Sequence, residues 1–429
     1  FGLLLYYLLP RRLQLRRIRR LRLRGARLRE VRPRSTGPVE ANETREQRSG
    51  LSALLAGADA TGTTRGNTLR WLPSGEEFLA AASAAIGGAK QHVHCVVYIF
   101  RPDAAGKRFL ALLTEAAQRG VAVRLCFDSF GSLGLKSVHL EPLRRAGGRA
   151  VAFLPLLWKR RPFTINLRNH RKLLVVDGEV GYVGGRNVGD EYFTDRLGQQ
   201  RPWLDAMVEV RGPAVERLQD VFVEDWCTAT DEVLADTFRL PPPSRRGVEL
   251  AVVCSGPDRD ESDLWFAVVQ AINDARTSVE LSSPYLVPPP TLLFALQLAA
   301  ARGVAVRLQT NGPKVEAAVL YHAQRSHYRQ FLASGVELYE SVADYNHAKV
   351  FVVDGRHVWV GSANMDLRSK HLNFEVAVVA LDAVELAQQV EATLAERRAR
   401  ARRITMDDLP TRPLARALDG VCGLLSPLL

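Results

Sequence analysis

The chain of 429 residues repeats part of itself, and this repetition limits what it can fold into more than any other feature. The heptapeptide RGVAVRL occurs at 119–125 and again at 302–308, each time after an alanine-rich stretch with helical spacing. Short apolar runs lie on either side of each copy, as expected of buried strands covered by helices. Matching positions are about 180 residues apart, so the sequence predicts an α/β fold built from two copies of one unit.

Length and composition fit this organisation, because 47% apolar and 24% charged residues are typical of globular chains. The five cysteines form no C-x-x-C pair, which argues against a zinc site and a disulfide framework and favours a reducing compartment. The predicted segments are a membrane-proximal apolar and Arg-rich segment (1–34), a polar linker (35–66), the first repeat domain (67–240), the second repeat domain (241–402), which opens with PPPSRR, and an amphipathic tail (403–429).

The net charge of +12 is concentrated at the N-terminal end. Residues 1–50 hold 14 Arg and 4 Glu, a net of +10, which leaves +2 for residues 51–429. A nuclease more often spreads basic side chains over its substrate groove, so this distribution argues against one. The segment begins FGLLLYYLLP and continues with dense Arg. This pattern is typical of the end of a transmembrane helix with its cytoplasmic flank, and the alternatives are a basic amphipathic helix lying on the membrane or a solvated tail.

One apolar stripe is expected on a helix near the C-terminus. Leu414, Leu418, Val421 and Leu425 fall at helical spacing. Such a stripe packs on the protein body or rests on a membrane, and the sequence leaves both alternatives open.

Each half carries the same set of polar residues at the same spacing. A His is followed by a Lys two positions later, an Asp five after that, and then a glycine-rich segment that ends in Asn. The first set is His170, Lys172, Asp177, Gly185 and Asn187, and the second is His347, Lys349, Asp354, Ser362 and Asn364. Equal spacing in both copies argues against chance surface residues.

The spacing predicts where these side chains lie. A His and a Lys two positions apart on a strand point to the same face. Each Asp-Gly between two apolar runs is typical of a tight hairpin. A two-residue loop would place Gly185 opposite His170 and Ser362 opposite His347. Each hairpin then gathers an imidazole, an ammonium and an amide at its open end, and two such ends would form one site.

This combination of groups suits phosphodiester chemistry. Lys and Asn side chains stabilise negative charge on phosphoryl oxygens. One imidazole can attack phosphorus while the other protonates the leaving alkoxide. No carboxylate cluster suited to Mg²⁺ accompanies the motifs, so no metal and no cofactor are expected.

The pattern H-x-K-x4-D-x6-G-(G/S)-x-N, present twice, resembles the phospholipase D superfamily. The flanking text RNHRKLLVVDGEVGYVGGRNVGDEY, GSANMDLRSKHLNFE, SSPYLVPP and LLSPLL is similar to bacterial cardiolipin synthases. The resemblance implies two phospholipase-D-like α/β/α sandwich halves packed around one shared active site. It also implies an enzyme of the bacterial cytoplasmic (inner) membrane, and the Arg-rich flank predicts that its catalytic domain faces the cytoplasm.

The resemblance further implies transfer of a phosphatidyl group between two molecules of phosphatidylglycerol. His170 would form a phosphatidyl-histidine and release glycerol, and His347 would act as acid and then as base. The lysines and asparagines would hold the phosphoryl oxygens, and Gly185 and Ser362 would contact the substrate beside them. Asp177 and Asp354 would act at the turns or orient a His of the opposite half, and the expected partners of the imidazoles are Glu191 and Glu375. Phosphatidylglycerol and anionic membrane lipid are the expected partners, and nucleic acid is not.

Several alternatives stay open at this point. A hydrolytic phospholipase D or another phosphatidyltransferase would use the same histidines with water or a different alcohol. A nuclease of the superfamily is disfavoured by the charge distribution, and a non-enzymatic scaffold by the intact double motif. The chain also departs from the family at Leu204, where Arg is usual, and at Lys370, where Phe is usual. These departures leave the acceptor lipid open.

Overall fold

The computed structural model describes residues 50–57, 62–155, 166–193, 202–234, 244, 247–258 and 262–424. The predictions for the segment 1–34, for most of the joint at 241–246 and for Leu425 lie outside the described residues.

Two α/β halves follow one another along the chain. The first contains β1 (Thr63–Leu72), α4 (Gly75–Gly88), β2 (His92–Val97), α5 (Ala104–Gln118), β3 (Ala122–Asp128), α6 (Ser137–Arg145), β4 (Arg149–Phe153), β5 (Arg168–Asn169), β6 (Leu173–Val176), β7 (Val180–Gly184), α7 (Asp190–Phe193), β8 (Met207–Arg211) and α8 (Ala214–Thr230).

The second half repeats this order with small additions. It contains β9 (Val248–Ser255), α9 (Asp263–Asp274), β10 (Ser278–Ser282), β11 (Leu286–Val287), α10 (Pro290–Ala301), β12 (Ala305–Asn311), α11 (Ala318–Ala333), β13 (Glu337–Ser341), β14 (Val350–Val353), β15 (His357–Gly361), β16 (Met365–Asp366), α12 (Leu367–His371), β17 (Asn373–Leu381), α13 (Val384–Ala399), β18 (Arg402–Ile404), the 3₁₀ turn η3 (Met406–Asp408) and α14 (Pro413–Leu424).

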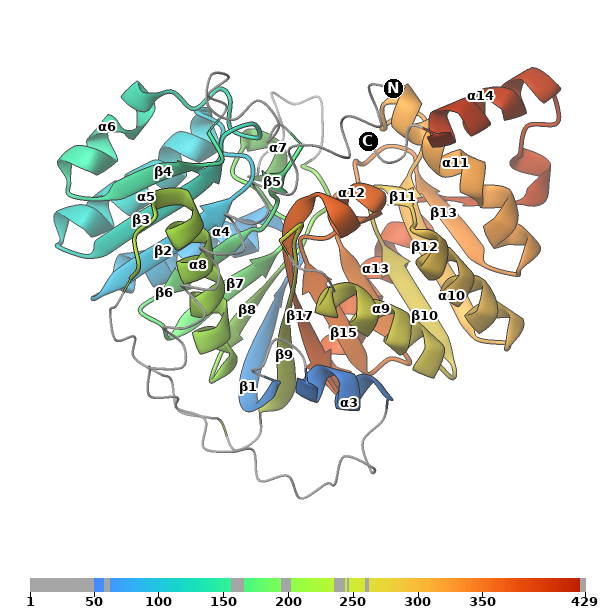
Figure 1. Ribbon diagram of the computed structural model, residues 1–429, viewed down its shortest axis with the longest axis horizontal. Coiled ribbons are helices and arrows are strands. Elements are labelled where there is room, and N and C mark those ends of the chain that lie inside the picture. The colour runs from blue at the N-terminus through green and yellow to red at the C-terminus, as the bar shows by residue number, and fades with distance from the viewer. Residues whose placement is uncertain are drawn as a thin grey trace.

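One continuous sheet joins the halves. Its strands run β18-β13-β12-β10-β14-β15-β17-β9-β1-β8-β7-β6-β2-β3-β4. The order reads alike in both directions from the antiparallel β1–β9 pair, so β6 and β7 correspond to β14 and β15, and β8 corresponds to β17. Figure 1 shows the halves side by side, with α7 and α12 in the upper middle of the view and α14 at its upper right. The predicted α/β fold of two repeated halves is confirmed.

The repeated heptapeptides become equivalent strands. Both β3 and β12 begin inside their RGVAVRL copy and run parallel to a strand on either side. Their central apolar side chains are buried because helices cover the sheet, as expected for continuous apolar strands. Local signals set the helix starts: Ser74 and Glu77 form a capping box before α4, and Asp103 caps α5.

The segment expected to be a linker, 35–66, is partly folded, which corrects the predicted domain boundary. Its residues Gly50–Gly57 form α3, whose Leu51 and Leu55 are buried in the core of the second half beside α9. The backbone N–H of Leu51 donates to a carboxylate oxygen of Asp274 over 2.8 Å. The sequence pattern did not predict this helix, because two buried leucines between polar flanks are too few to show a helical periodicity.

The hairpin register is one residue away from the predicted one. Val176 pairs with Val180, so the loop has three residues, not two. Asp177 and Gly178 lie in the left-handed region with φ of 53° and 66°, and the N–H of Glu179 donates to the Val176 carbonyl over 3.0 Å. Glu179 therefore adds one unpaired residue before the ladder begins.

The second hairpin has the same three-residue loop, because Val353 pairs with His357. The predicted pairs, Gly185 opposite His170 and Ser362 opposite His347, are therefore wrong by one position.

The C-terminal helix α14 leaves its apolar stripe in solvent. The carboxylate of Asp419 is bound by Arg325 on α11 over 2.8 Å, which fixes the opposite face of α14 to the body. Leu414, Leu418 and Val421 are 86%, 47% and 59% exposed. Of the two alternatives for this stripe, packing on the body is excluded for these three side chains.

Candidate active site

Backbone contacts with the opposite half hold both histidines in place. The N–H of His170 donates to the Phe374 carbonyl over 3.0 Å, where β5 runs parallel to the start of β17. The N–H of His347 donates to the Leu204 carbonyl over 2.7 Å at a parallel bridge between Leu204 and Asn346. Each half thus positions the histidine of the other.

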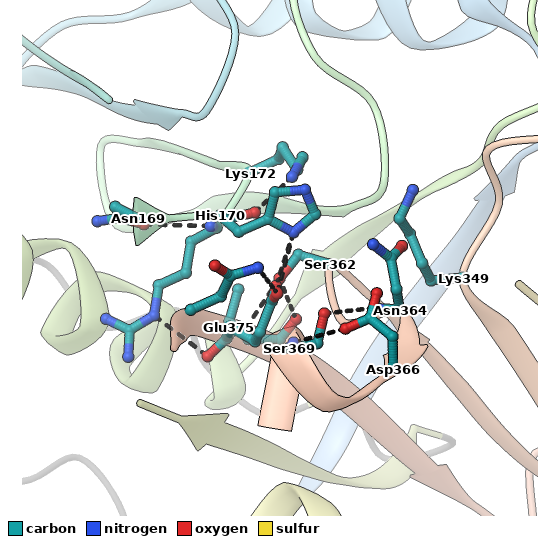
Figure 2. Close-up of polar contacts among 12 residues, drawn as sticks. Asn169, His170, Lys172, Lys349, Ser362, Asn364, Asp366, Ser369 and Glu375 are labelled. Carbon is teal, nitrogen blue, oxygen red and sulfur yellow. Dashed lines mark hydrogen bonds and ion pairs between the residues drawn. The ribbon is translucent and has the colours of Figure 1, made fainter. Parts of the chain in front are cut away.

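A carboxylate of the second half holds His170. Its Nδ1 lies 3.0 Å from Oε1 of Glu375, which is fully buried at the start of β17. Ser362 Oγ donates to the other oxygen of this carboxylate over 2.5 Å, and Asn373 donates to Oε1 over 3.2 Å. Figure 2 shows the His170 ring directed toward Glu375 and Ser362. The structure thus places Glu375 where the sequence analysis expected a partner for an imidazole.

His347 has a corresponding carboxylate from the first half, which the sequence analysis missed. Its Nδ1 lies 2.6 Å from Oδ2 of the fully buried Asp205. Asp205 lies two residues before Met207, as Glu375 lies two before Ala377, and these later residues face Gly184 and Gly361 in equivalent ladders. The internal repeat therefore held the signal for Asp205.

The prediction that Glu191 is the other carboxylate partner of an imidazole is wrong. Its Oε1 forms an ion pair with Arg101 over 2.5 Å, and no contact with either imidazole is found among the described residues. It lies on the short helix α7, which turns its carboxylate toward the 101–103 loop. Asp205, not Glu191, is the carboxylate partner of His347.

Each of the two lysines influences the pKa of both imidazoles. Lys172 and Lys349 each donate to the carbonyl of the histidine two residues earlier, so each ammonium is held beside its own imidazole. Burial lowers the pKa of Lys349 to about 8 and that of Lys172 well below its usual value. Each ammonium also lowers the pKa of His170 and of His347, which places the two motifs in one site.

The histidines are neutral near pH 7. Burial, opposed in part by Glu375, lowers the pKa of His170 to about 4. Burial and Lys349 lower the pKa of His347 to about 3. Burial works against ionisation of Asp205, but His347 and Lys349 hold its pKa at about 2. A neutral imidazole that donates its Nδ1–H to a carboxylate presents the lone pair of Nε2 for chemistry.

The two asparagines differ in their contacts. Asn187 is fully engaged, because its Oδ1 accepts the N–H of Ile99 over 3.0 Å and its Nδ2 donates to the Tyr192 hydroxyl over 2.8 Å. The Oδ1 of Asn364 has no hydrogen-bond partner within the described part of the chain. The Nδ2–H₂ group of Asn364 is the part of that side chain that could donate to a phosphoryl oxygen, as predicted, whereas Asn187 positions Tyr192.

Gly185 and Ser362, predicted to bind substrate, pack against the carboxylates instead. A Cβ on Gly185 would come within 2.3 Å of Oδ1 of Asp205, so only glycine leaves room for that side chain. Ser362 is fully buried and bound to Glu375. Both predictions are corrected, because these residues lie behind the imidazoles.

The motif aspartates tie each hairpin turn to a neighbouring strand. Asp177 accepts the backbone N–H groups of Lys90, Gln91 and His92 over 2.7–2.8 Å. Asp354 accepts the corresponding N–H groups at 276–278. The turns are at the far end of the hairpins from the histidines, and in the described part of the chain neither aspartate contacts an imidazole.

Partly exposed aromatic side chains surround the imidazoles. The Tyr98 ring lies 4.9 Å from that of His170, centroid to centroid. Trp203 and Tyr345 lie 5.7 Å and 6.4 Å from His347. No group of three or more metal-binding side chains occurs within the described ranges. The arrangement offers a nucleophile, an acid or base, and two cations for a phosphodiester.

Comparison with known proteins agrees with this geometry. A family model described as "Cardiolipin synthase, PLD-like domain" matches residues 83–226 and 268–398. The chain is 38% identical over 374 residues to a cardiolipin synthase of Geobacillus kaustophilus, covering 83% of this chain and 72% of the relative. It is also 38% identical over 382 residues to cardiolipin synthase A of Pseudomonas aeruginosa, covering 89% and 77%.

A solved structure shows the same fold. The phosphatidylserine synthase of Haemophilus influenzae matches with a TM-score of 0.66 over 84% of this chain and 95% of its own, at 14% identity. With two matched repeats and two relatives at this identity, the chain belongs to the cardiolipin synthase family of phospholipase-D-type phosphatidyltransferases.

Proposed function

We propose that this chain transfers a phosphatidyl group from one phosphatidylglycerol to another and releases glycerol, with a phosphatidyl-histidine as intermediate. The observation that carries the proposal is the crossed pair of contacts, His170 with Glu375 and His347 with Asp205. Among the described residues each imidazole directs Nδ1 toward a carboxylate, which leaves Nε2 for the phosphodiester, and the two lysines of the site can bind the phosphoryl oxygens. The names of the relatives supply the lipid product.

In the first step, Nε2 of His170 attacks phosphorus and the bond from phosphorus to the glycerol oxygen breaks. His347 gives its proton to that oxygen. In the second step, His347 takes a proton from a hydroxyl of the second phosphatidylglycerol, whose oxygen attacks phosphorus and breaks the phosphorus–nitrogen bond. The choice of His170 as nucleophile follows the family resemblance.

His347 must gain a proton before the first step. Both imidazoles are uncharged in the free site, where Glu375 and Asp205 face them. A bound phosphodiester adds one negative charge, which raises the proton affinity of an imidazole nearby. Substrate binding and protonation of His347 are therefore coupled.

The test is a product analysis with the purified full chain and phosphatidylglycerol in detergent. We expect cardiolipin and glycerol in equal amounts by mass spectrometry, with turnover unchanged by EDTA because the proposed steps use no metal. Phosphatidic acid as the main product would identify a hydrolase. DNA cleavage without lipid turnover would identify a nuclease.

We also propose that the chain works at the cytoplasmic surface of the inner membrane. No helix in the described part of the chain is long and apolar enough to cross a bilayer. Support comes instead from α14, whose exposed stripe lies near the site: Cys422 packs with Val287, which pairs with Asp366 just beyond Asn364. Arg412, just before the start of α14, is exposed and suits an anionic lipid surface.

Replacing both Leu414 and Leu418 with Asp should weaken binding of the full chain to phosphatidylglycerol vesicles about tenfold or more, because apolar surface is lost and charge repulsion is added. Cosedimentation measures the binding. The matched control is Val384→Asp, since Val384 is 48% exposed but adjoins Arg356 at the turn end of the molecule. Turnover in detergent should stay normal. Unchanged vesicle binding, or a changed oligomeric state instead, would contradict a membrane role for α14.

A further inference from the structure

Three polar side chains beside His347 have no part in the phosphoryl chemistry. The hydroxyl of Tyr345 donates to Oε2 of Glu316 over 3.2 Å, and the hydroxyls of Tyr285 and Tyr345 are 3.1 Å apart. We call Tyr285, Tyr345 and Glu316 the hydroxyl cluster. All three side chains are partly exposed, so the cluster meets solvent.

The cluster is held rigidly against the site. Glu316 accepts the N–H of Ala317 over 2.8 Å and the amide of Asn311 over 3.1 Å. Asn311 also accepts the N–H of Asn346 over 2.8 Å, which anchors the segment that carries Tyr345 and His347. Burial still raises the pKa of Glu316, so its carboxylate would gain from further hydrogen-bond donors.

An aromatic wall connects the cluster to the histidine. The Trp203 ring lies 4.3 Å from Tyr345 and 5.7 Å from His347, centroid to centroid. The backbone N–H of Leu204 donates to the Tyr345 carbonyl over 2.9 Å, which fixes this wall across the two halves. A group bound at the cluster would therefore lie next to the imidazole that handles the alcohol proton.

In the two-step transfer, two different molecules would occupy the place beside His347 and the hydroxyl cluster in turn. The departing glycerol receives its proton from His347, and the incoming alcohol gives its proton to the same imidazole, so both occupy one place. Each carries hydroxyls that take no part in bond making. A carboxylate flanked by phenolic hydroxyls can accept and donate hydrogen bonds to such a polyol.

Resting on the function proposed above, we infer that the hydroxyl cluster is a glycerol-binding subsite, which holds the spare hydroxyls of both the leaving glycerol and the acceptor phosphatidylglycerol. By holding the lipid acceptor beside His347, the subsite favours transfer over hydrolysis of the phosphatidyl-enzyme. Water gains nothing from it, because water has no second hydroxyl to bind.

The test is the ratio of cardiolipin to phosphatidic acid formed from the same intermediate. Glu316→Gln should lower this ratio about tenfold or more, since a hydrogen bond to a charged group contributes about 1.5–3 kcal/mol. Tyr345→Phe should lower it in the same direction. In the exchange of labelled glycerol into phosphatidylglycerol, Glu316→Gln should raise the KM for glycerol by a similar factor with little change in kcat.

The matched control is Glu337→Gln. Glu337 accepts a hydrogen bond from the hydroxyl of Tyr339 over 2.6 Å, so it forms a similar Tyr–Glu pair. This pair lies on β13, next to the edge strand β18. This variant should keep the wild-type ratio. A Glu316→Gln enzyme that loses both products in equal proportion, or keeps the ratio and the KM for glycerol, would overturn the subsite. Wild-type protein that forms no cardiolipin would instead overturn the proposed function.

Discussion

Replacing His170 or His347 with alanine should lower turnover of phosphatidylglycerol by a factor on the order of 10³ or more. The loss is this large because nucleophile and acid act as one unit: without His170 no intermediate forms, and without His347 the glycerol alkoxide leaves unprotonated. Initial rates in detergent with mass-spectrometric detection measure the effect. Near-normal turnover in either variant would rule out the two-histidine mechanism.

The same variants decide which histidine attacks. With lipid labelled in its phosphatidyl group, the His347→Ala chain should retain label on His170 after an acid-free quench, because the step that consumes the adduct needs a base. Peptide mapping locates the label. Label on His347 in the His170→Ala chain, with none on His170 in the reciprocal variant, would reverse the assignment.

Replacing the crossed carboxylates should have the next largest effect. Asp205→Asn and Glu375→Gln should each lower kcat by about 10²–10⁴, as when the aspartate that orients a catalytic histidine becomes an amide. The amide side chains keep the volume but present a donor, so the imidazole loses the tautomer that exposes the Nε2 lone pair. Steady-state rates and thermal unfolding should be measured together, so that loss of turnover is compared at equal folding.

Glu191→Gln is the matched control for these carboxylates. It removes a negative charge that pairs with Arg101 and touches neither imidazole among the described residues, so we expect turnover within about threefold of wild type. A loss as large as that of Asp205→Asn would mean that net charge, and not contact with the imidazole, is what matters.

Much of this site could be predicted from the sequence, because the duplication carried the information. Two copies of one spacing identified both His-Lys pairs, and the repeated strands gave the α/β fold. The structure brings the pairs together, with Glu375 beside His170. Asp205 was missed because its equivalence to Glu375 becomes visible only when β8 and β17 are aligned by their strand pairing, which the residue pattern does not report.

Other features depend on local geometry that the residue pattern does not report. Each hairpin loop has three residues, and its Asp177 or Asp354 binds backbone N–H groups of a neighbouring strand, a contact between distant segments. Ser362 and Gly185 looked like substrate contacts from the assumed register. They support carboxylates instead, which only the packing behind the imidazoles reveals.

The exchange of carboxylates between the halves has a consequence for how the enzyme regains activity after unfolding. If one half folds alone, its imidazole still lacks the acid group that sets its tautomer, and its own carboxylate faces an imidazole that is not yet in place. A refolding chain therefore passes through no half-active intermediate. Recovery of turnover reports the moment when β1 and β9 join the two sheets, and a probe of helix content would report an earlier event.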